Sequence, residues 1–158
     1  MSMIQIREMT IEDCDAVADI DRACFTQVWS VAMFRDTLAF PAYYYVVSVI
    51  LTDHPENTDE GRIVGFAGIS IAADTADVIN IGVLPEYRGQ GIGNLLLQKL
   101  EELAKDNNCL NMMLEVRESN LPAIQMYHKH GFQDISVRKN YYSNPAEHGI
   151  VMQKLMNP

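Results

Sequence analysis

The amino-acid sequence predicts an α+β fold in which helices flank a mixed, mostly antiparallel sheet. First, segments rich in β-branched and aromatic residues recur along the chain, and Tyr43–Leu51 is the clearest of them. Second, the strands in the middle of the chain follow one another through a hairpin loop and a turn, so we expect them to be antiparallel. Third, two helical segments alternate with strands in the second half, so the sheet is expected to be mixed.

The first half of the chain predicts three strands and two helices, each marked by periodicity or by a capping residue. Thr10 and Ser30 are suited to cap helices, because a short hydroxyl side chain can accept from the free amides of a first turn. In order, we expect a strand at Ile4–Met9, a helix from Thr10 to Cys24, a short helix after Ser30 carrying Met33, Phe34 and Leu38, a strand at Tyr43–Leu51, a hairpin loop at Thr52–Gly61 and a strand at Arg62–Ile71.

The second half predicts four strands and two helices. Asn107-Asn108 and Gly131 mark helix ends, because Asn and Gly tolerate the left-handed conformation found there. In order, we expect a strand at Val78–Leu84, a helix from Ile92 to Asp106, a strand at Asn111–Val116, a helix from Ser119-Asn120 to His130, a strand at Phe132–Arg138, a polar loop at Lys139–His148 and a strand at Gly149–Leu155.

Size and composition describe an ordinary globular chain. Its 158 residues suffice for one substantial core, and no repeat, low-complexity segment or linker interrupts them, so we expect one domain at 1–158. No apolar run is long enough to cross a bilayer, and the N-terminal residues do not resemble a signal peptide. The expected location is therefore the cytoplasm, with no membrane partner.

Charge, cysteines and histidines argue against several classes of function. The net charge of −9 disfavours direct nucleic-acid binding, which needs a basic surface. It suits a cationic substrate or a basic peptide, but plain solubility is the simpler explanation of most of these charges. Three scattered cysteines predict no disulfide framework, and His128 and His130 would diverge on a helix. We therefore expect reduced thiols and no metal site.

The most informative segment joins the strand at Val78–Leu84 to the following helix. It reads Arg88-Gly89-Gln90-Gly91-Ile92-Gly93 and holds three glycines in five residues. Backbone amides at a helix N-terminus bind anions when no side chain blocks the approach, and Arg88 would add positive charge. The functional interpretation is a phosphate or pyrophosphate cradle, and the alternative is simply a tight strand-to-helix turn. No Gly-Lys-Ser/Thr follows, and the glycine spacing does not fit a dinucleotide fold.

This segment resembles the Arg/Gln-x-x-Gly-x-Gly/Ala motif of the GNAT acetyltransferases, which binds the pyrophosphate of coenzyme A. The stretch from Asn120 to Phe132 likewise resembles the GNAT pattern Asn-x-x-Ala-x-x-x-Tyr-x-x-x-Gly-Phe. Within that superfamily, Leu114–Asn120 and Arg138–Tyr142 are similar to the RimI-type ribosomal-protein-alanine N-acetyltransferases. In the first half, Thr26–Ser30 departs from the Pro-Trp-Ser expected there.

The resemblance implies the GNAT fold and acetyl transfer from acetyl-CoA, without a metal, to an amine. The implied acceptor is the N-terminal α-amino group of a protein, with a small-subunit ribosomal protein as the family's example. The implied cofactor-binding residues lie on the strand end, the glycine-rich turn and two helix starts. They are Ile81, Gly82, Val83, Arg88, Gly89, Gln90, Gly91, Ile92, Gly93, Asn94 and Asn120.

Two residues match the family's catalytic positions. Glu115 is the candidate base that takes a proton from the amine, directly or through a water, and otherwise a half-buried structural carboxylate paired with Arg117 or a neighbour. Tyr127 is the candidate acid for the departing thiolate, and otherwise a core tyrosine. A backbone amide near Ile81–Val83 is expected to polarise the thioester, with the pantetheine pairing beside Gly82 like an added strand.

Aromatic residues are the candidates for binding the acceptor. Trp29, Tyr141 and Tyr142, together with Phe25, are expected to line a peptide groove, although Trp29 is more simply a packing residue between two helices. Two other functions stay open beside the protein acetyltransferase: a small-molecule amine acetyltransferase on the same fold, and a non-catalytic module that binds coenzyme A.

Overall fold

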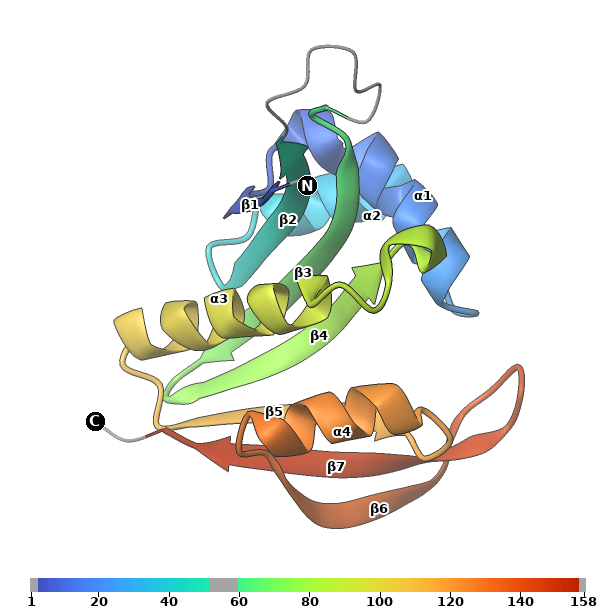
Figure 1. Ribbon diagram of the computed structural model, residues 1–158. Helices are drawn as coiled ribbons and strands as arrows, with labels where there is room; N and C mark the ends of the chain where they lie inside the picture. The colour runs from blue at the N-terminus through green and yellow to red at the C-terminus, as the bar shows by residue number, and fades with distance from the viewer. Residues whose placement is uncertain (1–2, 52–59, 157–158) are drawn as a thin grey trace. The chain divides into compact units, whose positions relative to one another are not determined.

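The computed structural model describes residues 3–51 and 60–156 and contains the α+β fold that the sequence predicts (Figure 1). Seven strands hydrogen-bond in the order β1-β2-β3-β4-β5-β7-β6. The pairs β1–β2, β5–β7 and β7–β6 are antiparallel, and β4–β5 is parallel. The strands are β1 (Met3–Glu8), β2 (Tyr43–Leu51), β3 (Ile63–Ala72), β4 (Thr75–Val83), β5 (Asn111–Arg117), β6 (Gln133–Tyr142) and β7 (Glu147–Leu155).

Four α-helices lie among the described residues, and side-chain caps start two of them, one at the predicted Ser30 and one at Asn120. The Ser30 hydroxyl accepts from the amide of Met33 at 3.2 Å, and the Asn120 amide oxygen accepts from the amide of Ala123 at 3.3 Å. Asn108 and Gly131 adopt positive φ after the helices they follow, as predicted. The helices are α1 (Cys14–Cys24), α2 (Val31–Leu38), α3 (Ile92–Asp106) and α4 (Leu121–Lys129).

Several boundaries were predicted wrongly. The helix predicted from Thr10 begins as α1 at Cys14, after a short 3₁₀ turn at Ile11–Asp13. Strand β4 begins at Thr75 rather than at Val78. The predicted loop at Lys139–His148 shrinks to residues 143–146, because β6 continues to Tyr142 and β7 begins at Glu147. Strand β6 lies at the sheet edge and is exposed almost throughout, so its polar sequence resembles that of a loop. Most of the predicted hairpin loop at Thr52–Gly61 lies outside the described residues.

The chain forms two compact units. The first unit comprises the residues up to Ile69 together with Ile79–Leu100, and the second comprises Ser70–Val78 together with the residues from Glu101 on. Strands β3 and β4 and helix α3 contribute to both. The prediction of one domain at 1–158 stays a prediction.

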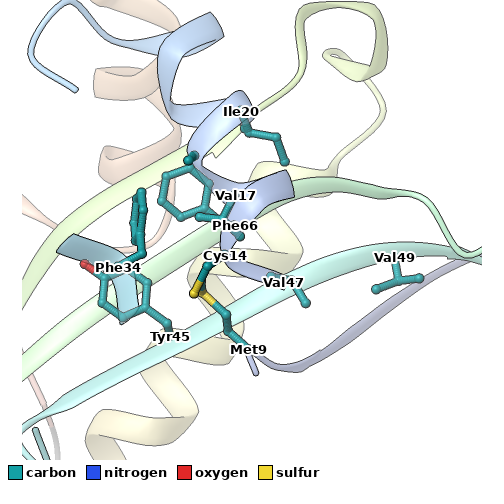
Figure 2. Close-up of a cluster of buried hydrophobic side chains, with 10 residues drawn as sticks. Met9, Cys14, Val17, Ile20, Phe34, Tyr45, Val47, Val49 and Phe66 are labelled. Carbon is teal, nitrogen blue, oxygen red and sulfur yellow. The ribbon is translucent and has the colours of Figure 1, made fainter. Parts of the chain in front are cut away.

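The core of the first unit lies where α1 and α2 cover one face of β2 and β3 (Figure 2). Phe34 of α2 packs edge-on against Tyr45 and Phe66, with ring centroids 6.1 and 5.8 Å apart. The Tyr45 hydroxyl is buried there without a hydrogen-bond partner among the described residues. The core of the first unit consists of Met9, Cys14, Val17, Ala18, Ile20, Phe34, Tyr45, Val47, Val49 and Phe66.

The second unit is built on β5, β7 and β6. Strand β5 alternates strictly, with Met112, Leu114 and Val116 buried and the residues between them half-buried. It pairs with β7 along its whole length, which places Glu115 opposite Val151. From α4, the buried Tyr127 packs edge-on against Phe132, with ring centroids 5.8 Å apart. The core therefore fixes one face of β5 and leaves Glu115 on the other.

Candidate functional site

The glycine-rich turn of the first unit is shaped by two residues in the left-handed region. Gly89 has φ +79° and Gly91 has φ +82°, and a side chain at either position would be strained. A Cβ at Gly89 or Gly91 would meet no heavy atom within 4 Å. The buried Ile92 begins α3 directly afterwards, so the free amides of the first helical turn lie beside this open side. The arrangement suits an anion such as a phosphate group.

Arg88 in this structure lies on the end of β4. Its Nε donates to the carbonyl oxygen of Val83 at 2.9 Å, and its Nη2 lies 3.4 Å from the Sγ of Cys24. The thiol of Cys24 also lies 3.4 Å from the same carbonyl oxygen. The guanidinium thus fastens the turn to the strand that precedes it. A contact between Arg88 and a bound anion stays a prediction.

The other residues predicted to contact the cofactor in this unit lie on β4 and at the start of α3. Gly82 is closely packed, since an added Cβ would lie 3.0 Å from the Phe66 ring, 3.3 Å from Cys24 Sγ and 3.4 Å from Phe25. A side chain there would force these neighbours apart. Ile81 and Val83 are half-buried on either side, and Gly93 is half-buried, whereas Gln90 and Asn94 are exposed.

Trp29 lies at the edge of the first unit's core. Its ring contacts Phe34 and Tyr45, with centroids 5.2 and 6.5 Å apart, and its backbone amide donates to the buried carboxylate of Asp21 at 2.8 Å. Burial raises the pKa of Asp21, and this hydrogen bond opposes the shift. The structure supports the packing role for Trp29, and contact with an acceptor stays a prediction.

In the second unit, the structure brings Glu115, Tyr141 and Tyr142 together. The Nε of Arg138 lies 3.4 Å from the Glu115 carboxylate, and the same guanidinium lies 5.4 Å from the Tyr141 ring centroid. The rings of Tyr141 and Tyr142 pack edge-on at 4.9 Å. Burial raises the pKa of Tyr142 to about 12, with smaller contributions from Tyr141 and Glu115. A carboxylate that can accept a proton thus lies beside two aromatic rings.

Asn120 and Tyr127 lie on the next helix. Asn120 uses its side-chain oxygen to cap α4 and is itself exposed. Burial raises the pKa of Tyr127 above the ordinary value of 10.0, so its phenol stays protonated at neutral pH. The protonated phenol can donate a hydrogen bond.

Arg117, Arg138 and Glu147 were not predicted as site residues. Arg138 pairs with Glu115, for which the sequence suggested Arg117 or a neighbour. Arg117 pairs instead with Glu147, at 3.3 Å. The sequence signal that could have identified Arg117 as a site residue is the alternation of β5, which places Glu115 and Arg117 on one face. The contact between Arg138 and Glu115 had no such signal, because Arg138 lies on a long polar strand whose sequence resembles a loop.

Among residues 3–51 and 60–156, no group of three or more His, Cys, Asp or Glu side chains is placed to hold a metal ion. His128 and His130 turn to different carboxylates, those of Asp134 at 2.9 Å and Glu101 at 2.6 Å. In the same described ranges, no helix is long and apolar enough to cross a membrane.

Named proteins resemble this chain along nearly its whole length. A Bacillus subtilis protein, provisionally named a ribosomal protein bS18-alanine N-acetyltransferase, is 35% identical over 153 residues, covering 96% of this chain and 95% of the relative. The Mycobacterium tuberculosis N-alpha-acetyltransferase RimI is 33% identical over 157 residues, covering 96% and 92%.

A solved structure also resembles this chain. The crystal structure of the ribosomal-protein-S18-alanine N-acetyltransferase from Escherichia coli matches with a TM-score of 0.84 and 27% identity, over 99% of this chain and 96% of that one. The model of the Acetyltransferase (GNAT) family matches residues 14–132, well over half of the chain. The glycine-rich turn, the fold and these similarities together lead to one conclusion: this chain belongs to the GNAT family and is an N-acetyltransferase.

Proposed function

We propose that this chain transfers the acetyl group of acetyl-CoA to the N-terminal α-amino group of a protein, and that residues 1–158 act as one domain in the cytoplasm. The observation that carries the proposal is the similarity over 96% of the chain to relatives named for acetylating bS18 or an α-amine. An N-terminus resembling that of ribosomal protein bS18 is the first acceptor to test.

The glycine-rich turn fits the pyrophosphate of acetyl-CoA. Gly89 and Gly91 leave open exactly the space that side chains would fill, beside free amides at the start of the long helix α3. Arg88 would contribute by holding the turn to Val83 and by its charge. The backbone amides of Ile81–Val83 are the proposed contacts for the pantetheine and the thioester oxygen. Asn94 and Asn120 are the remaining proposed contacts.

In the proposed reaction, the amine nitrogen bonds to the thioester carbonyl carbon and the carbon–sulfur bond then breaks. Glu115 accepts one proton from the protonated amine, directly or through a water. Tyr127 donates one proton to the departing sulfur, and the second proton that the nitrogen loses restores Tyr127 through solvent. An ordinary α-amine has a pKa of about 8, so much of it is protonated at pH 7 and needs this base. Tyr141, Tyr142 and Trp29 are proposed to contact the first acceptor residues.

Thiol release with acetyl-CoA tests the proposal. One arm contains a peptide beginning with alanine and copying the bS18 N-terminus, a second its N-terminally blocked form, and a third a panel of small amines. We expect release with the free peptide only. Turnover of a small amine but not of the peptide would instead support a small-molecule acetyltransferase. Binding of acetyl-CoA without turnover in any arm would support a non-catalytic module.

Replacing Gly91 with Ala is expected to weaken acetyl-CoA binding by about 10-fold. The methyl group would strain a backbone at φ +82° by about 1 kcal/mol and would project into the open side of the turn. Calorimetric titration with acetyl-CoA measures the effect. Gly61 is the matched control, since it also has a positive φ, +78°, and open space around it, so G61A shares the strain but not the expected loss of affinity. Equal affinities in both variants would contradict the cradle.

A further inference from the structure

Arg117, at the end of β5, is the centre of a set of contacts around the turn that joins β6 to β7. Its Nη1 donates to the carbonyl oxygen of Pro145 at 2.9 Å, and its Nη2 donates to that of Ser143 at 3.0 Å. Its guanidinium carbon lies 4.5 Å from the ring centroid of Tyr142. One side chain therefore holds both the backbone of the turn and the aromatic residue that precedes it.

Glu147 continues these contacts toward helix α4. One carboxylate oxygen lies 3.3 Å from Arg117 Nη1, and the other accepts from the backbone amide of Ser119 at 2.6 Å. The carboxylate side chain is only 11% exposed. Ser119 directly precedes Asn120, which caps α4, the helix that carries Tyr127. Glu147 thus joins the β6–β7 turn to the start of the helix that bears the candidate acid.

Hydrogen bonds from Ser119, and then the charge of Arg117, hold the pKa of Glu147 below its ordinary value of 4.5. A lowered pKa means that the charged carboxylate stabilises the folded chain above pH 4.5, and that this contribution is lost as the pH falls through the folded-state value. At neutral pH the pair is therefore fully charged.

We propose that Arg117 and Glu147 are positioning residues that fix the β6–β7 turn, and with it Tyr141 and Tyr142, against the start of α4. The inference rests on the proposed function, because the effect of Arg117 and Glu147 is measured as a change in the KM of the acceptor. Tyr141 and Tyr142 lie beside Glu115, the candidate base. If the turn loosens, both rings lose their fixed place beside that carboxylate, whereas the glycine-rich turn keeps all the contacts described above.

Lysine cannot replace Arg117 fully. Nη1 of the guanidinium contacts the Pro145 carbonyl and the Glu147 carboxylate, Nη2 contacts the Ser143 carbonyl, and the group lies over the Tyr142 ring. An ammonium group cannot reach all of these at once. A lysine at this position keeps the charge and one or two contacts. We therefore expect graded effects, with R117K between the wild type and R117A.

The test measures kcat and both KM values for wild type, R117K, R117A and E147Q, with acetyl-CoA and the alanine-starting peptide. We expect R117A to raise the peptide KM by about 10-fold or more, while the acetyl-CoA KM stays within about twofold. R117K should recover part of the loss. Hydrogen exchange of residues 143–149 should quicken in R117A and not in R22A, which removes an exposed arginine that pairs with Asp19 on α1.

The outcomes separate this inference from the proposed function. Faster exchange in R117A with an unchanged peptide KM would show that the pair is merely structural and would overturn the inference. Unchanged exchange in R117A would also overturn it, because Arg117 would then not hold the turn. If wild type acetylates a small amine instead of the peptide, the same KM comparison is made with that amine. If wild type acetylates nothing, the proposed function fails and the acceptor role fails with it, while exchange still reports whether Arg117 holds the turn.

Discussion

Replacing Glu115 with Gln is expected to lower kcat for peptide acetylation by about 100- to 10,000-fold at pH 7. Glutamine keeps the shape of the side chain but cannot accept the proton that the amine must lose. Glu115 lies on a β5 face that its buried neighbours Leu114 and Val116 fix, so the substitution should leave the fold intact. Steady-state rates at saturating acetyl-CoA measure the effect.

The pH dependence of E115Q gives a sharper test. An α-amino group has a pKa of about 8, so it loses its proton to solvent as the pH rises past that value. The defect of E115Q should therefore shrink between pH 6.5 and 9.5. Glu118→Gln, an exposed neighbour, is the matched control and should keep the wild-type rate. A constant defect across this range would argue that Glu115 binds the acceptor rather than accepts a proton.

Replacing Tyr127 with Phe is expected to lower kcat by about 100-fold or more, with the acetyl-CoA KM little changed. Burial keeps the phenol protonated, and phenylalanine lacks the hydroxyl that is proposed to donate to the departing sulfur. A thiol has a pKa of about 8.5, so above that pH the released thiol stays ionised and no longer requires a proton, and the defect should shrink there.

Tyr45→Phe is the control for this substitution. Tyr45 is also buried, burial also raises its pKa, and its hydroxyl has no partner among the described residues. Y45F should therefore keep the wild-type rate, and loss of an unsatisfied hydroxyl should raise the free energy of unfolding by about 1 kcal/mol. Equal rates for Y127F and wild type would leave Tyr127 as a core residue packed on Phe132.

Local patterns predicted most of the fold. The caps at Ser30 and Asn120 and the left-handed residue Gly131 act within a few residues of chain, so periodicity and side-chain chemistry suffice to find them. The order of strands and helices followed from the same signals. Strand β6 was cut short because an exposed edge strand tolerates the polar residues that also mark loops.

The contacts around the candidate site could not be predicted in the same way. Arg138 reaches Glu115 because β7 pairs with both β5 and β6, and this register depends on residues far apart in the chain. Similarly, nothing in the motif around Arg88 indicates that its guanidinium would hold Val83 and Cys24. Side-chain partners across strands are decided by tertiary packing, which a single sequence does not display.

The strand order β5-β7-β6 also bears on how the chain is made. Strand β7 is synthesised after both of its neighbours, yet it lies between them and opposes Glu115 through Val151. While a ribosome is still translating Glu147–Leu155, β5 and β6 have no shared partner, and the face that carries Glu115 cannot be assembled. The candidate base Glu115 therefore meets its β7 neighbour Val151 only after β7 has been translated.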